Sequence, residues 1–343
     1  MLISISRAAA LLGAGAALAF GFPAMARDVG GVACQTPPPF HCADTGCTPP
    51  LIAEPGNAVE PKTGRKFFLD YPCDLKPGEK VTFILNLHGG GSIGNWQRHY
   101  FPIVDLKEKY RLVIATPSGS DLGWNPAKDD DYLRNIVAQV YADFGAANIK
   151  AFWLAGHSLG GQTSNRLLTT EPFRSRLTGW VSLSGGRLGS RREDVRAPIP
   201  GPGGQPAPPP GMPPGTPMRL AADASILPDF AFSHIYETGE HELTAAGLPG
   251  ESPWARKLNC GGQTPGAWVI DTQAGYVADT RVQANPNPIW GGKPRPGSAQ
   301  VYLYPGCADG KIVADIVRLD KGHTEGLEPH ITEEIVKLML AAK

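Results

Sequence analysis

The pentapeptide GHSLG at residues 156–160 places the strongest constraint on how this chain can fold. It fits the pattern G-x-S-x-G, in which a strand turns so sharply into a helix that only small residues fit two positions before and after the serine. An apolar strand is predicted at residues 151–155, and a helix from about Gly161 to Leu168. Short motifs match by chance in a chain with 42 glycines. The position between strand and helix nevertheless favours a turn that holds Ser158 at the edge of a sheet.

Strands and helices alternate along the chain on both sides of this turn. Apolar runs of strand length fall at residues 66–69, 81–87, 112–116, 151–155, 180–184, 230–236, 301–304 and 312–317. Alternation of this kind is typical of a mostly parallel sheet with helices on both faces. The fold class is therefore α/β, and the serine turn within it predicts the α/β-hydrolase fold.

Two helices have a clear apolar stripe. One is expected to begin at the three aspartates that start with Asp129, whose charges suit the positive end of a helix dipole. The other is C-terminal, and its shared face consists of Ile331, Ile335, Leu338 and Met339.

The first 26 residues have the plan of a secretory signal peptide. Arg7 precedes an apolar stretch at residues 8–22, and residues 24–26 form an A-x-A cleavage site. A membrane anchor is the alternative, but the stretch is too short to cross a bilayer as a helix. We therefore expect a secreted or periplasmic protein without membrane contact after cleavage.

The rest of the chain is predicted to form one domain with two additions. Residues 27–65 are rich in Pro, Gly and Cys and indicate an irregular, disulfide-rich N-terminal segment. Residues 66–343 form the expected catalytic domain, in which residues 187–229 are a Pro/Gly-rich insertion. The insertion is either a lid that contacts substrate or a solvated linker, and its scarcity of bulky apolar residues favours the linker.

Six cysteines follow the predicted cleavage site, and an even number in an exported chain points to disulfides. Their distribution favours a bridge between Cys260 and Cys307 and two bridges among the N-terminal four, which are Cys34, Cys42, Cys47 and Cys73. A metal site is the weaker alternative, because no C-x-x-C pair is present.

Charge excludes some classes of partner. With 32 basic and 32 acidic residues the formal net charge is zero, which offers no electrostatic attraction for nucleic acid or an anionic membrane surface. We expect a monomer whose specificity comes from a pocket for its substrate.

A nucleophilic serine needs a base and an acid that orients it, and in this fold the chain order is Ser, acid, His. His323 lies on a loop directly after the last predicted strand, whereas His330 begins the terminal helix, so His323 is the candidate base. The acid is expected after the sixth predicted strand, where Glu237, Glu240 and Glu242 lie. Glu242 is the first choice, because the acid often lies three residues beyond a turn glycine, and Glu240 is the alternative.

Backbone N–H groups that face the developing oxyanion are each typically worth about 2.7–4 kcal/mol. One donor is expected from Leu159, directly after the nucleophile. The other is expected from the HGGG loop at residues 88–91, with Gly90 as first choice and Gly91 as the alternative. The zinc-protease and phosphate-loop motifs are incomplete, so the predicted chemistry requires neither metal nor cofactor.

With these residues in place, the chain resembles the extracellular polyhydroxybutyrate depolymerase and feruloyl esterase group of α/β-hydrolases over about residues 66–340. The matching segments are LHGG at 87–90, GWN at 123–125, GHSLGG at 156–161, residues 254–260, GCADG at 306–310 and GH at 322–323. The chain departs from the group at the acid, where relatives usually carry aspartate after a His-Gly turn, and in the insertion.

The resemblance implies a secreted serine esterase that acts on hydroxyalkanoate, feruloyl or acetyl esters, some of them polymeric. It implies that Trp124 lines the acyl or aromatic side of the cleft, and that the bridge between Cys260 and Cys307 lies beside the histidine loop. Trp96 and Tyr100 are expected to form an aromatic rim, although the sheet core needs aromatic residues too. His157 completes the expected substrate contacts, which are therefore Trp124, Trp96, Tyr100 and His157.

The expected reaction is a two-step acyl transfer through an acyl-enzyme on Ser158. A short- to medium-chain lipase is one alternative, but it requires an apolar lid that the insertion is too polar to supply. A non-catalytic binding protein on a hydrolase scaffold is the other, because a fold by itself does not establish a function.

Overall fold

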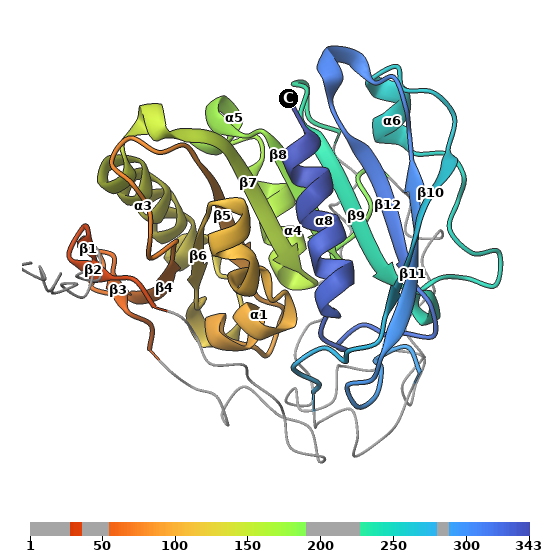
Figure 1. Cartoon of the computed structure of the whole chain (residues 1–343), viewed down its shortest axis with the longest axis horizontal. Helices are drawn as coiled ribbons and strands as arrows, with labels where there is room; N and C mark the ends of the chain where they lie inside the picture. Colours follow the sequence, from red (N-terminus) through yellow and green to blue (C-terminus); the bar gives the residue numbers. More distant parts are fainter. Residues whose placement is uncertain (1–27, 36–54, 190–226, 280–287) are drawn as a thin grey trace, which may run out of the picture.

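The computed structural model of the chain describes residues 28–35, 55–189, 227–279 and 288–343. Within these ranges a ten-stranded sheet has the order β10-β11-β12-β9-β8-β7-β5-β6-β4-β3, and β1 and β2 form a separate hairpin (Figure 1). The strands are β1 (Asp28–Val29), β2 (Val32–Ala33), β3 (Ala58–Val59), β4 (Lys66–Asp70), β5 (Val81–Leu87), β6 (Leu112–Pro117), β7 (Ile149–His157), β8 (Gly179–Leu183), β9 (Ser233–Gly239), β10 (Thr264–Asp271), β11 (Gly297–Leu303) and β12 (Val313–Arg318). The α-helices are α1 (Gly94–Tyr100), α2 (Lys107–Tyr110), α3 (Pro126–Phe144), α4 (Leu159–Leu167), α5 (Phe173–Arg176), α6 (Pro253–Lys257) and α8 (Pro329–Ala341).

The middle of the sheet is parallel. Strands β6, β5, β7, β8, β9 and β12 pair in this order as parallel neighbours. Antiparallel strands extend both sides, with β4 and β3 beyond β6 and β11 and β10 beyond β12. This mostly parallel sheet with a serine turn after β7 confirms the predicted α/β-hydrolase fold.

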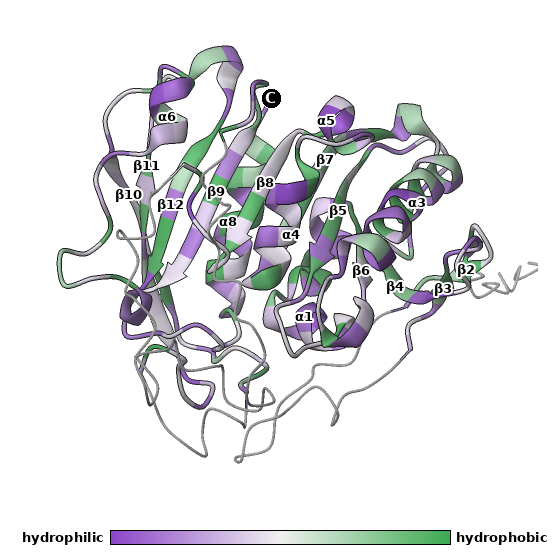
Figure 2. Cartoon of the chain, turned by 180° about the vertical axis from the view of Figure 1, so that it is seen from behind, coloured by the Kyte–Doolittle hydropathy of each residue, from purple (hydrophilic) through white to green (hydrophobic). Residues whose placement is uncertain are grey.

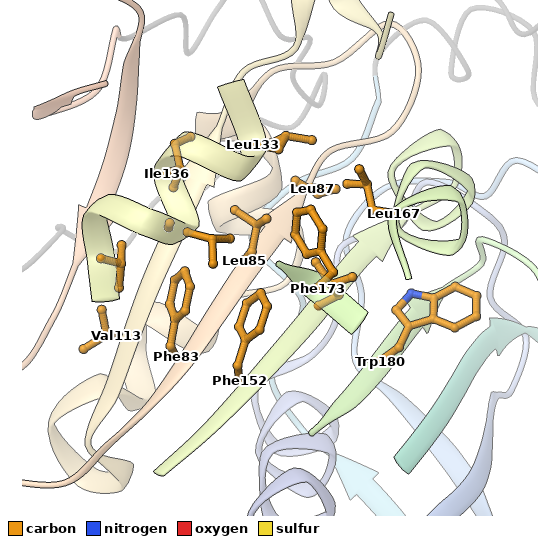
Figure 3. Close-up of a cluster of buried hydrophobic side chains, with 14 of the residues drawn as sticks. Phe83, Leu85, Leu87, Val113, Leu133, Ile136, Phe152, Leu167, Phe173 and Trp180 are labelled. Atoms are coloured by element: carbon orange, nitrogen blue, oxygen red, sulfur yellow. The ribbon is translucent and has the colours of Figure 1, made fainter. Parts of the chain in front are cut away.

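Both faces of the sheet are covered by helices, which explains why all seven residues of β5 are buried. On one face, Phe83 and Leu85 pack against Leu133 and Ile136 of α3, in the cluster drawn in Figure 3. On the other face, residues of α1 and α8 pack together with Ile84 in a second cluster. Figure 2 shows hydrophobic stretches along β5 and β7 and mixed patches on α3, as expected for an amphipathic helix over a buried sheet.

Helix α3 begins before Asp129, the start that the sequence predicted. Its first residue is Pro126, and the side chain of Asn125 accepts a hydrogen bond from the Ala127 N–H at 3.0 Å. Proline suits the first helical position, and asparagine is a strong N-cap. Asp129 instead lies buried inside the first turn and pairs with Arg65 at 2.7 Å.

The main sheet includes residues before residue 66, because β3 pairs with β4. The N-terminal segment is not wholly irregular either, since Val29 and Val32 of the β1–β2 hairpin are buried in the core. The reason in both cases is that short strands pair through the backbone and need little apolar sequence. Strand β10 was missed for a similar reason: Pro265 and Gly266 interrupt its apolar pattern.

The N-terminal end of the predicted insertion belongs to the core. Arg187 is 3% exposed and forms an ion pair with Asp315 of β12 at 2.6 Å, and Leu188 is fully buried. Residues 190–226 lie outside the described ranges, as does the predicted signal peptide. Within the described ranges, no helix combines the length and apolar composition needed to cross a bilayer.

Disulfides join Cys34 to Cys73 and Cys260 to Cys307. The second bridge agrees with the predicted pair, but it does not lie beside the histidine loop. Cys307 precedes β12 and His323 follows it, so the two lie at opposite ends of this six-residue strand. Cys42 and Cys47 lie outside the described residues.

Candidate active site

The turn between β7 and α4 is as tight as the motif predicts. Ser158 has φ 51° and ψ −118°, a conformation that side chains rarely adopt. A Cβ added to Gly156 would lie 2.4 Å from the carbonyl of Gly160, and one added to Gly160 would lie 2.3 Å from the Leu87 carbonyl oxygen. The N–H of Ser158 donates to the Leu183 carbonyl at 2.9 Å. The neighbouring strands therefore approach the turn at backbone distance, which only glycine permits.

His323 and Glu242 are in direct contact although they lie 81 positions apart in the chain. The Nδ1 of His323 is 2.6 Å from Glu242 Oε2. The other carboxylate oxygen, Oε1, accepts hydrogen bonds from Ser184 Oγ at 2.5 Å and from the Gly239 N–H at 3.1 Å. Since Nδ1 faces the carboxylate, the Nε2 of His323 is the nitrogen left to exchange a proton.

The environment keeps Glu242 ionised. Burial alone would raise the pKa of this carboxyl, but the positive charge of a protonated His323 and the hydrogen bonds from His323, Ser184 and Gly239 hold it below its usual value. A carboxylate in this state can fix the histidine tautomer and stabilise the imidazolium.

The other candidates for acid and base lie elsewhere. Glu240 is exposed, and its Oε2 accepts a hydrogen bond from the Asp320 N–H at 2.8 Å. Glu237 is fully buried and pairs with Arg318 at 2.6 Å. The His330 side chain is 56% exposed at the start of α8, as the sequence predicted.

Trp290 is a residue that the sequence interpretation missed. Its ring meets that of His323 edge to face, with centroids 5.1 Å apart, and the side chain is half-buried. The adjoining backbone holds the histidine loop, because the His323 N–H donates to the Ile289 carbonyl at 2.8 Å and the Thr324 N–H to the Trp290 carbonyl at 2.9 Å. In the sequence, only the two glycines after Trp290 indicate a turn at this position. They do not indicate that the turn lies beside His323.

The HGGG loop is held by its histidine. Nε2 of His88 accepts a hydrogen bond from the Gly119 N–H at 2.9 Å, so Nδ1 carries the proton and donates to the Gly89 carbonyl at 2.7 Å. Burial lowers the pKa of His88 to about 4, which keeps the ring neutral. The ring of Trp124 lies over His88 with centroids 4.6 Å apart, and its indole N–H donates to the His88 carbonyl at 2.8 Å.

The two oxyanion candidates in this loop differ in their hydrogen bonds. The N–H of Gly91 donates to the Leu122 carbonyl at 2.7 Å, so the alternative assignment to Gly91 does not fit. Gly90, the first choice, precedes it in the same loop. Leu159 is the first residue of α4, where N–H groups have no partner within the helix.

The aromatic residues predicted to contact substrate lie in the core instead. Trp96 is 3% exposed, Tyr100 0%, Trp124 7% and His157 3%. Trp96 stacks on Tyr100 at 5.0 Å, and Tyr100 on His157 at 4.0 Å. Trp96 and Tyr100 belong to the buried cluster that contains Ile84, and Trp124 belongs to the cluster on the other face of the sheet.

Comparison with known proteins gives a limited likeness. No family model matches the sequence, and no curated protein is significantly similar to it. Among solved structures, the fluorophosphonate-binding serine hydrolase FphF of Staphylococcus aureus aligns at 16% identity and a TM-score of 0.28, over 35% of this chain and 52% of its own. The chain thus spans about half the length of FphF.

Two esterases align over more of their length. The esterase Est2 of Thermogutta terrifontis has 15% identity and a TM-score of 0.36, over 54% of this chain and 71% of its own. The acetyl xylan esterase of Aspergillus awamori has 15% identity and a TM-score of 0.44, over 80% and 94%. These neighbours are serine hydrolases or esterases, but similarity at this level identifies no substrate, and the fold assignment rests on the sheet topology.

Proposed function

We propose that this protein is a serine esterase that hydrolyses carboxylic esters, with Ser158 as nucleophile, His323 as general base and Glu242 as the acid. The observation that carries the proposal is the 2.6 Å contact between His323 Nδ1 and Glu242 Oε2, on loops after β12 and β9 at the sheet end where β7 delivers Ser158. Serine, acid and histidine follow one another in the order that this fold uses.

In the proposed reaction the hydroxyl of Ser158 attacks the ester carbonyl while His323 Nε2 takes its proton. The N–H groups of Leu159 and Gly90 receive the developing oxyanion. His323 then protonates the leaving alcohol, and water, activated by the same histidine, releases the acid from the acyl-enzyme. Glu242 stabilises the imidazolium in both steps.

The substrate class follows from the family resemblance and is part of the same proposal. We infer a secreted or periplasmic enzyme for hydroxyalkanoate, feruloyl or acetyl esters, which acts as a monomer. Trp290 is the half-buried aromatic beside His323, and a flat apolar group of the substrate can pack against it.

The first test is labelling by a fluorophosphonate, which reacts with an activated serine. We expect the wild-type protein to be labelled and to cleave short p-nitrophenyl esters, and Ser158→Ala to lose both while it remains folded. Ser175→Ala, at a serine of α5 bonded to Glu171, is the matched control and should retain both.

Labelling that persists in Ser158→Ala would contradict the nucleophile. A folded wild-type protein that neither reacts nor cleaves any ester from acetate to palmitate would contradict the enzyme and favour a binding protein. A preference for medium-chain esters such as octanoate over acetate would favour the lipase alternative.

A further inference from the structure

The backbone carbonyl of His323 accepts two hydrogen bonds from the nucleophile side of the site. One comes from the Tyr100 hydroxyl at 3.1 Å, and the other from Nε2 of His157 at 2.9 Å. His157 is the residue directly before Ser158. The nucleophile turn is thereby bonded to the main chain of the candidate base.

His157 is a neutral donor at this position. Burial and the nearby charge of His323 keep its pKa well below the usual value. Because a carbonyl oxygen only accepts, Nε2 must carry the single ring proton. The other nitrogen, Nδ1, is buried without a hydrogen-bond partner among the described residues and lies against Gly89, where an added Cβ would be 2.7 Å away.

The imidazole of His157 has little freedom to move. Its ring centroid lies 4.0 Å from that of Tyr100, 5.9 Å from that of Trp96 and 4.9 Å from that of His323. The N–H of His323 is held separately by the Ile289 carbonyl at 2.8 Å. Both backbone polar groups of His323 are therefore bonded, and the carbonyl is bonded to the residue directly before the nucleophile.

We propose that His157 is a positioning residue, which holds the His323 main chain at the distance from Ser158 that proton transfer requires and does not contact substrate. The inference rests on the proposed function and deepens it. Glu242 orients the His323 ring through Nδ1, whereas His157 locates the backbone from which that ring projects. The Glu242 contact fixes the orientation of the ring, and the His157 contact fixes the position of the main chain. A variant that restores one contact therefore does not compensate for loss of the other.

The test compares three replacements of His157. In His157→Leu we expect kcat to fall about 100-fold with little change in KM, because a displacement of about 1 Å has an effect of this size on a positioned reaction. The rate of fluorophosphonate labelling should fall in parallel. In His157→Gln most of kcat should return, because the amide nitrogen stands as many bonds from Cα as the lost Nε2. His157→Asn, whose amide is one bond shorter, should behave like the Leu variant.

A matched control separates positioning from stability. His234 is also buried and neutral, with a pKa of about 3 because of burial. It bonds the Trp180 carbonyl at 3.2 Å and pairs with the first residue of β12, whereas His323 follows the last residue of that strand. His234→Leu should lower the melting temperature and leave kcat unchanged. Tyr100→Phe, which removes the other donor to the same carbonyl, should lower kcat less than His157→Leu and keep the core packed.

Two results would overturn the inference: an unchanged kcat in His157→Leu, or equal losses in the Gln, Asn and Leu variants at equal melting temperature. If His157→Leu fails to fold, the Gln and Asn pair and Tyr100→Phe decide the question. A failure of the proposed function is seen separately, as activity that survives Ser158→Ala.

Discussion

The two sides of the candidate site are held by different forces. On the nucleophile side, strands and loops approach one another at backbone distance through glycines: an added Cβ would lie 2.7 Å from His157 Nδ1 at Gly89 and 2.3 Å from the Leu87 carbonyl at Gly160. On the acid–base side, the loop that carries His323 is held by buried charges. Arg318 pairs with Glu237 at 2.6 Å and with Glu328 at 3.3 Å, and all three are fully buried.

Buried charges also hold the loop that carries His323. Lys321 pairs with Glu328 at 2.6 Å, and Glu325 accepts a hydrogen bond from the Gly322 N–H at 2.8 Å. Close packing is disrupted when an atom is added, whereas the stability of buried charged groups changes when a charge is added or removed. The comparison therefore predicts that an added atom on the nucleophile side destabilises the protein at every pH. On the acid–base side, it predicts that a change of charge has an effect even when the size of the side chain is unchanged.

The largest expected effect tests charge at constant shape. Glu242→Gln keeps the size of the side chain but not its charge, so it cannot stabilise the imidazolium, and we expect kcat to fall about 10⁴-fold. Glu240→Gln makes the same change on the exposed neighbour and should leave kcat nearly unchanged. Steady-state kinetics on a p-nitrophenyl ester measure both. Equal losses in the two variants would remove the distinction between these glutamates.

The second test adds a methyl group without any charge. In Gly160→Ala the new Cβ would lie 2.3 Å from the Leu87 carbonyl and 2.6 Å from the His88 carbonyl, neither of which can rotate away. We expect the free energy of unfolding to fall by about 3 kcal/mol, with loss of activity at every pH. Gly262→Ala is the control, because no atom of the described residues lies within 4 Å of its added Cβ. Urea unfolding that gives equal stabilities for both variants would refute the steric account.

The smallest expected effect is a change of stability with pH that comes from the buried carboxyl of Glu237. Burial, only partly offset by Arg318, raises the pKa of Glu237 from 4.5 to about 6. The folded state then binds more protons than the unfolded state between these values, so this group makes the protein less stable as pH rises through the window. The shift corresponds to about 2 kcal/mol.

Glu237→Gln removes this titration. Measured relative to wild type, the unfolding free energy of the variant should therefore increase by about 2 kcal/mol between pH 4 and pH 7. Urea unfolding at several pH values gives this difference directly. A difference that stays constant over the whole range would show that Glu237 does not titrate in the folded state.

The strands that were predicted correctly are those buried on both faces, such as β5, whose apolar run has the same limits in sequence and structure. Strands β3 and β10 were missed, because a two-residue strand and an edge strand with Pro265 carry almost no apolar pattern. The predicted start of α3 at Asp129 was wrong, because Asn125 caps the helix and Pro126 is its first residue.

The candidate site divides in the same way. Ser158 and His323 were identifiable because a turn motif and a loop after a strand are local patterns. Glu242 was preferred over Glu240 only because of its spacing from Gly239. Which of the two contacts His323 depends on how β9 and β12 pair. No sequence pattern indicated Trp290 or the bond from His157 to the His323 carbonyl. Trp96 and Tyr100 are buried and so do not form the rim that the sequence predicted.

The sequence by itself determined the mostly parallel sheet, the serine turn and the chain order of the candidate residues, because each depends on sterics and periodicity among neighbouring residues. Only the tertiary structure decided which carboxylate meets His323, which aromatics are core and which lies beside the base, and that His157 bonds the histidine loop. These contacts join residues 81 and 166 positions apart. Their partners are selected by strand order and register, which no local pattern of residues encodes.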